Sequence, residues 1–171
     1  MEEKMKKKLS LIMVAVMLTF CLFGCGFFGS EDSAEQGEKV CKVGETIKYG
    51  NLEFTFKSVD IYVDNSDWAM DKAADGKEFV ILSFEAKNIG DSDDYINSLN
   101  EDSYCDDSAI DPVSLLFNYN GDTIWGEIAS GKKREGYVAY QLPIGWENIE
   151  LIYTNGSQKI TFIGNSSDIV E

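Results

Sequence analysis

Apolar and polar residues alternate along much of the chain, which is the pattern of β-strands with one buried face. Two apolar sets follow one another along the segment NLEFTFKSVDIYVD: first Leu52, Phe54 and Phe56, then Val59, Ile61 and Val63. The second set is out of phase with the first, so one regular strand cannot turn both toward the same core. The pattern therefore predicts a bulge or a change of strand near residues 57–58.

The same alternation recurs downstream between turn signals. Residues 78–88, EFVILSFEAKN, form a strong predicted strand, and the extra apolar residues Phe79 and Ile81 predict that its first half is covered on both faces. Asn-Gly pairs at 120–121 and 155–156 separate further alternating runs, as in β-hairpins. Residues 135–143 end at a proline, which cannot donate a ladder hydrogen bond.

These segments predict about seven short strands over residues 42–164. No segment of the sequence has the pattern of a long amphipathic helix, and the crossovers of a parallel sheet would need such helices. We therefore expect an all-β fold, with two antiparallel sheets packed as a β-sandwich. Residues 165–171 are expected to be a C-terminal tail.

The N-terminal segment has the pattern of a targeting signal. Four lysines within residues 4–8 precede an uncharged apolar run over residues 9–22. A helix of that length measures only about 21 Å, which is shorter than the hydrocarbon core of a bilayer, roughly 30 Å thick. A positive segment, a short apolar run and a following small residue are typical of a secretory signal.

The sequence LFGCG at residues 22–26 resembles the lipobox of bacterial lipoproteins, with Cys25 as the invariant cysteine. In that family the thiol carries diacylglycerol, and cleavage leaves the cysteine as the new N-terminus. The resemblance implies a signal peptide over residues 1–24 and a lipid anchor at Cys25, on the extracytoplasmic face of the cell membrane. Residues 25–41 would then be the lipidated cysteine and a flexible acidic linker. An ordinary secreted protein and an uncleaved anchor are the alternatives.

The composition disfavours some classes of partner and excludes some kinds of catalysis. The chain has 30 acidic and 15 basic residues and a formal net charge of −15. That charge disfavours nucleic acid and anionic membrane surfaces as partners, whereas cationic partners and divalent metals are compatible with it. The chain contains no histidine. Ser-His-Asp and Cys-His catalysis are therefore excluded, and the commonest ligand of catalytic zinc is missing.

Three motifs resemble a known family over roughly residues 42–164. They are VGE at 43–45, GKEFVILSFEAKNIGDSD at 76–93, and IASGKKREGYVAYQLPIGWENIELIY at 128–153. The family is the immunoglobulin-like domain of unknown function found on many Firmicutes lipoproteins, often labelled a telomeric-repeat-binding-factor domain and related to a secreted mycobacterial immunogenic antigen. The resemblance implies an immunoglobulin-like β-sandwich. It transfers no catalytic residues.

Two cysteines form a candidate disulfide. Once Cys21 leaves with the signal and Cys25 carries lipid, Cys41 and Cys105 remain, in a compartment that permits disulfides. A bridge between them would stabilise the domain by roughly 4 kcal/mol in the chain-entropy model. Two free thiols, or partners on another chain, are the alternatives.

Two acidic loops form a candidate cation site. Their aspartates are Asp91, Asp93, Asp94, Asp102, Asp106 and Asp107. Carboxylate oxygens are the ligands that Ca²⁺ prefers, but the spacing does not fit an EF-hand loop. The alternative is that these residues serve solvated turns, where aspartate is common.

Aromatic residues suggest a further binding surface. Trp68, Trp125 and Trp146, with the tyrosines, could form a platform for a carbohydrate or peptide, and core packing is the alternative. We expect a non-catalytic binding or interaction domain, anchored to the membrane through its N-terminal lipid, for an unidentified protein, peptide, cell-wall component or cation. An accessory or structural lipoprotein that modulates a cell-envelope complex is the alternative, and an enzyme that uses carboxylates alone is third.

Overall fold

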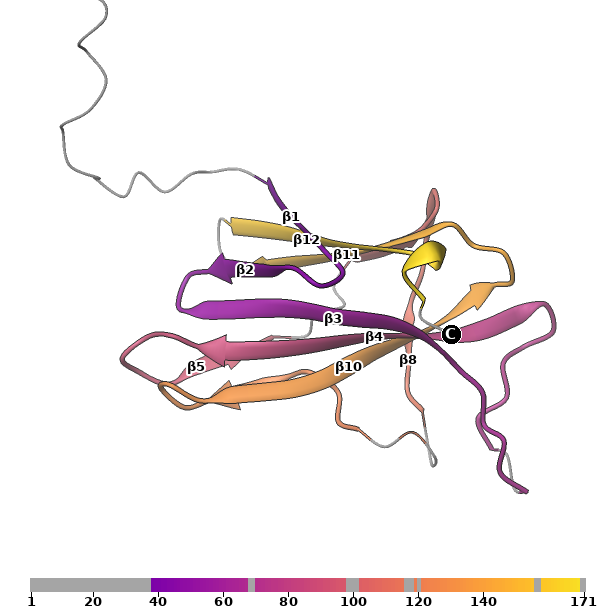
Figure 1. Ribbon diagram of the computed structural model, residues 1–171, viewed down its shortest axis with the longest axis horizontal. Helices are drawn as coiled ribbons and strands as arrows, with labels where there is room; N and C mark the ends of the chain where they lie inside the picture. Colours follow the sequence, from indigo (N-terminus) through magenta and orange to yellow (C-terminus); the bar gives the residue numbers. More distant parts are fainter. Residues whose placement is uncertain are drawn as a thin grey trace, which may run out of the picture. The chain divides into compact units, whose positions relative to one another are not determined.

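Twelve strands in three sheets make up most of the described chain (Figure 1). The computed structural model describes residues 38–67, 70–97, 102–115, 119, 121–155 and 158–169. The first sheet has the order β1-β12-β11-β6-β7, the second has the order β2-β3-β4-β10-β8, and β5 pairs with β9. The strands are β1 Glu38–Lys42, β2 Thr46–Tyr49, β3 Leu52–Tyr62, β4 Lys77–Asn88, β5 Asp94–Ile96, β6 Asp102–Cys105, β7 Ser108–Ala109, β8 Pro112–Val113, β9 Gly126–Ile128, β10 Lys133–Pro143, β11 Asn148–Asn155 and β12 Gln158–Asn165.

The two five-stranded sheets enclose an aromatic core. In Figure 1, β11 and β12 lie above β2, β3, β4 and β10. Between the sheets, Phe56 stacks on Phe84 with ring centroids 4.8 Å apart, and Phe162 meets Phe84 edge-on at 5.1 Å. All three side chains are buried. Aromatic pairs in these arrangements stabilise a core beyond the area that they bury. The predicted all-β sandwich is confirmed.

The predicted irregularity in β3 is a β-bulge. Phe56 lies opposite Phe84 of β4, but Ser58 lies opposite Ser83, so Lys57 is the extra residue. The bulge lets the apolar positions on both sides of it face the core. Val59 is as deeply buried as Phe56, although a spacing of three positions would place the two side chains on opposite faces of a regular strand.

The other strong predicted strands are present as well. Residues 78–88 lie within β4, and residues 135–143 lie within β10, which pairs with β4 along its full length. Phe79 and Ile81 are buried although they point away from the main core, which confirms that the first half of β4 is covered on both faces. The hairpin of β11 and β12 closes between Asn155 and Gln158.

The ends of the domain differ from the predicted ones. β1 begins at Glu38, inside the segment predicted as linker, and its Cys41 is buried. β1 runs parallel to β12, whereas only antiparallel pairing was predicted. No hairpin joins these two strands, so neither direction is imposed, and β1 covers an edge of β12 that would otherwise be open.

The predicted C-terminal tail also belongs partly to the fold. β12 continues to Asn165, a 3₁₀ turn follows over Ser166–Asp168, and Ile169 packs against the core. Gln36–Glu171 is one compact unit that contains the whole core. Within the described ranges, no helix has the length and apolar character needed to cross a membrane.

Candidate functional site

The outer face of the second sheet carries a row of tyrosines. Tyr62 of β3, Tyr119 and Tyr137 of β10 contact one another edge to face, with ring centroids 5.4 Å apart for Tyr62–Tyr119 and 4.5 Å for Tyr119–Tyr137. Beneath them, Ile81 and Ala139 are buried in a second, smaller apolar cluster. These ring contacts therefore hold Tyr119 against the outside of the sheet.

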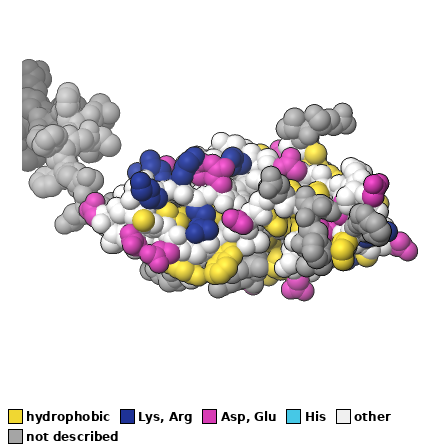
Figure 2. Space-filling view, turned by 90° about the horizontal axis from the view of Figure 1, so that it is seen from below, with side chains coloured by type: hydrophobic (Ala, Val, Ile, Leu, Met, Phe, Trp, Pro, Cys, Tyr) yellow, Lys and Arg dark blue, Asp and Glu magenta, His cyan; other side chains and the backbone are white. Residues whose placement is uncertain are grey.

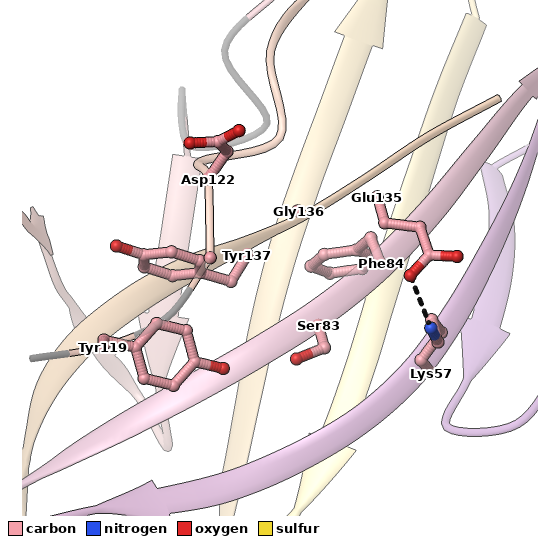
Figure 3. A pocket seen from close by; sticks show the side chains of 9 residues that line it. Lys57, Ser83, Phe84, Tyr119, Asp122, Glu135, Gly136 and Tyr137 are labelled. Carbon is pink, nitrogen blue, oxygen red and sulfur yellow. Dashed lines mark hydrogen bonds and ion pairs between the residues drawn. The ribbon is translucent and has the colours of Figure 1, made fainter.

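A pocket of about 190 Å³ lies beside the row, and we call it the tyrosine pocket (Figure 3). The polar and charged side chains that line it are Lys57, Ser83, Tyr119, Asp122, Glu135 and Tyr137. Figure 3 shows the Tyr119 hydroxyl directed toward Ser83, with the Lys57–Glu135 ion pair on the opposite side of the pocket. β3, β4, β10 and the segment before β9 thus each contribute to one site.

A close backbone contact fixes one wall of the pocket. The N–H of Tyr137 donates to the carbonyl of Asp122 at 3.0 Å, and the N–H of Ile124 donates to the carbonyl of Tyr137 at 3.2 Å. A Cβ atom on Gly136 would lie 2.7 Å from the Asp122 oxygen and from the Ile124 nitrogen. Only glycine at this position lets the chain pass so close to β10.

A small ion-pair network borders the pocket. The Lys57 Nζ lies 3.0 Å from the Glu135 Oε2, while Lys133 reaches Glu135 at 3.2 Å and Glu85 at 2.7 Å. Hydrogen bonds from Lys57 and then from Lys133 lower the pKa of Glu135 to about 2. Glu135 is therefore ionised at neutral pH. Basic and acidic side chains are interleaved in the same way toward the left of the face in Figure 2.

Tyr137 is protonated and lies in a negative field. Burial raises the pKa of Tyr137, and neighbouring Tyr119, Asp71 and Asp122 raise it further. The phenol therefore stays neutral in the physiological range, where a hydroxyl can donate one hydrogen bond and accept others. A second pocket, of about 380 Å³, lies beside Tyr62 and is bordered by Asp64 and Asp71.

The candidate cation site is not assembled. The loop with Asp91, Asp93 and Asp94 follows the C-terminal end of β4, whereas Asp106 contacts the turn after β10, at the opposite end of the β4–β10 pair. In the part of the chain that the structure describes, no three Cys, Asp or Glu side chains are placed to hold a metal ion. The predicted convergence of the two acidic loops is therefore wrong.

Two of these aspartates serve turns instead. The Asp106 carboxylate accepts hydrogen bonds from the N–H groups of Glu147 at 3.2 Å and Asn148 at 3.0 Å. The Asp93 carboxylate accepts one from the N–H of Ser130 at 3.1 Å. Both contacts satisfy backbone donors at bends of the chain, which was the alternative interpretation of the acidic loops.

The candidate disulfide is not formed. Cys41 and Cys105 are free and buried. β12 and β11 separate β1 from β6, so these two strands lie about 14 Å apart at typical strand spacing. A disulfide needs Cα atoms within about 7 Å. Burial raises the pKa of the Cys41 thiol to about 11. Such a thiol is a poor nucleophile at neutral pH.

Trp125 and Trp146 do not form a shared platform. Trp146 is buried, and its indole N–H donates to the Glu78 carboxylate at 3.1 Å. Trp125 is 59% exposed, and Trp68 lies outside the described residues. The Asn-Gly turn predicted at 120–121 falls partly outside them too, and Thr123 bridges to Tyr137 of β10.

Sequence reasoning missed the tyrosine pocket because its residues are far apart in the chain. A usable signal was present in β3 and β10. Tyr62 and Tyr137 occupy positions that alternate away from the core, where a solvent-facing strand would carry polar residues. Aromatic rings, a hydroxyl and an ion pair around one cavity are suited to non-covalent binding by stacking, hydrogen bonds and charge.

Comparison with known proteins identifies similar domains. Residues 41–161 match the family described as Domain of unknown function (DUF4352). The Uncharacterized lipoprotein YjhA of Bacillus subtilis (strain 168) is 27% identical over 126 residues, which are 68% of this chain and 59% of that protein. The chain thus matches less than two thirds of the length of this curated relative. The predicted family resemblance is confirmed.

Two crystal structures have a similar fold. The yjhA protein from Bacillus subtilis superposes with a TM-score of 0.57 at 24% identity, covering 76% of this chain and 99% of that one. The secreted protein MPT63 from Mycobacterium tuberculosis gives a TM-score of 0.52 at 9% identity, covering 75% and 98%. At these identities the likeness concerns the fold alone.

Proposed function

The chain belongs to the DUF4352 family of domains of unknown function, and we propose that it is a lipid-anchored, extracytoplasmic protein whose β-sandwich is a non-catalytic binding module. Support for the anchor comes from the lipobox-like sequence at residues 22–26 and from the lipoprotein name of a relative. The residues between Cys25 and Glu38 can span at most about 45 Å. The domain would therefore work close to the membrane surface.

The tyrosine pocket is the observation that carries the binding function. It combines aromatic walls with a few polar groups of fixed direction, which is the usual composition of a ligand site. The strands β3, β4 and β10 hold these groups on a rigid support. The chain has no histidine, and Cys41 and Cys105 are buried, which supports binding over covalent catalysis.

Metabolic labelling with a palmitate analogue tests the anchor. We expect label in the wild-type protein and in a Cys21→Ser variant, and none in Cys25→Ser, because only the cysteine of the lipobox is acylated. Cys21 is the matched control, since it lies in the same segment. Label that persists in Cys25→Ser would rule out this anchor.

A fragment screen by NMR on ¹⁵N-labelled residues 36–171 tests the binding site. We expect bound fragments to shift the amide signals of Gly121, Gly136 and Tyr137 around the pocket. Tyr119→Ala should abolish these shifts, whereas Tyr104→Ala, on the exposed side of the first sheet, should not. Fragments that all map to other surfaces, or that are chemically converted, would refute the proposal.

A further inference from the structure

The charges that line the tyrosine pocket do not balance. Asp122 and Glu135 are acidic, and Lys57 is the only basic residue among the lining residues that the structure describes. Lys57 is already paired with Glu135 at 3.0 Å, and Lys133, which reaches Glu135 at 3.2 Å, is itself paired with Glu85 at 2.7 Å. The positive charge of Lys57 is thereby neutralised by Glu135 in the pocket wall. Among the described residues that line the pocket, Asp122 is left as the carboxylate without a basic partner.

Tyr119 and Tyr137 supply the surface on which a cation can rest. Both rings and Asp122 line the same pocket, and in Figure 3 the Tyr137 ring lies between Tyr119 and the Asp122 carboxylate. A ring face attracts an ammonium or guanidinium group placed within about 6 Å of its centre, and more strongly where water is partly excluded. Tyr137 is buried and Tyr119 is half-buried, so water has limited access to one side of such a contact.

Negative charge surrounds the row beyond the pocket itself. Asp71 and Asp122 act on Tyr137 from two different segments of the chain, and both raise its pKa. The chain as a whole carries a formal net charge of −15. A surface of this sign raises the local concentration of cations and speeds their association. An anionic ligand would meet repulsion both from Asp122 and from the whole domain.

We infer that the tyrosine pocket binds an organic cation, an ammonium or guanidinium group, against the tyrosine rings and near the carboxylate of Asp122. The inference rests on the proposed binding function and specifies the ligand class of the same site. Two sources could supply this chemistry: a lysine or arginine side chain of a protein partner, or a free amine. Ser83 and the Tyr119 hydroxyl are placed to hydrogen-bond the group that carries the cation.

Three probes of similar size and different charge test the inference on residues 36–171 by NMR titration. They are n-butylammonium, the neutral butyramide and the anionic butyrate. We expect n-butylammonium to bind at the pocket at least about fivefold more tightly than the other two. Its affinity should fall as the salt concentration rises, because exposed charges are screened.

Variants of the pocket test which side chains bind n-butylammonium. Asp122→Asn, which keeps the shape of the side chain, and Tyr119→Leu should each weaken n-butylammonium binding by roughly fivefold or more. Tyr119→Phe retains the ring and should bind nearly as well as the wild type. Asp107→Asn is the matched control, because it removes one exposed aspartate at the turn after β6. A thermal melt of each variant establishes that it is folded.

Two outcomes separate the inference from the function on which it rests. Equal or tighter binding of butyramide or butyrate at the pocket would overturn the cation inference and leave the binding module standing. A pocket that binds none of the probes would also overturn it, and the fragment screen would then decide whether the site binds anything. A lysine-containing tripeptide that binds more tightly than n-butylammonium assigns the cation to a protein partner, and equal affinities assign it to a free amine.

Discussion

Replacing Gly136 with alanine should detach the wall of the tyrosine pocket. The new Cβ would lie 2.7 Å from the Asp122 oxygen and the Ile124 nitrogen, both of which are backbone atoms. Such overpacking costs about 1–3 kcal/mol. Retreat of the segment would also weaken the hydrogen bonds of 3.0 Å and 3.2 Å to Tyr137, worth roughly 1 kcal/mol each. We expect the free energy of unfolding to fall by about 2–4 kcal/mol in total.

Urea unfolding of residues 36–171, followed by tryptophan fluorescence, measures this loss. Gly121→Ala is the matched control in the same wall. Its Cβ would meet only the side chains of Tyr119 and Tyr137, at 3.4 Å, so its stability should change by no more than about 0.5 kcal/mol. If Gly136→Ala were as stable as Gly121→Ala, the close contact between this segment and β10 would be wrong.

Three further predictions concern buried and charged groups. In the native protein, Cys41 and Cys105 should react slowly with a thiol reagent because burial raises their pKa values. Denaturation without reductant should make both thiols reactive. A disulfide between them would contradict the fold. Tyr140→Phe removes the 2.7 Å hydrogen bond to Ser103 and should lower the free energy of unfolding by about 1–2 kcal/mol. The same substitution should lower it by less in a Ser103→Ala background. Equal losses in the two backgrounds would exclude the hydrogen bond. The pKa of Glu135 is lowered to about 2, so the stability that its carboxylate contributes is complete above the usual pKa of glutamate and is lost as the pH falls toward 2. Between pH 5 and 2.5, Glu135→Gln should therefore lose less stability than the wild type. Equal losses would refute the ion pair.

The strands were predictable because their signal is local. Burial on one face imposes a period of two on neighbouring residues, and β4 shows that period from Leu82 to Asn88. β1 was missed because its five residues, EKVCK, continue the charged composition of the segment before them. Its strand character depends on pairing with β12, more than 100 residues away in the chain, and a local pattern contains no such information.

The candidate sites failed for a related reason. Cys41, Cys105 and the aspartates were selected by residue type, and residue type does not determine which strands are neighbours. Two intervening strands separate the cysteines, and the length of the β4–β10 pair separates the acidic loops. Pairing order is set by contacts between distant segments, so a chemically reasonable set of residues can be scattered by the topology.

The bulge in β3 connects the predictable part of the structure to the part that was missed. Without the extra residue, the alternation before Phe56 would turn Tyr62 toward the core and Ile61 toward solvent. With it, the register after Ser58 is reversed, and Tyr62 joins Tyr119 on the outer face. The inserted residue, Lys57, also points outward and pairs with Glu135 at the pocket. The phase shift visible in the sequence therefore turns the Tyr62 ring to the outer face, where it joins Lys57, which the alternation before the bulge already directs outward.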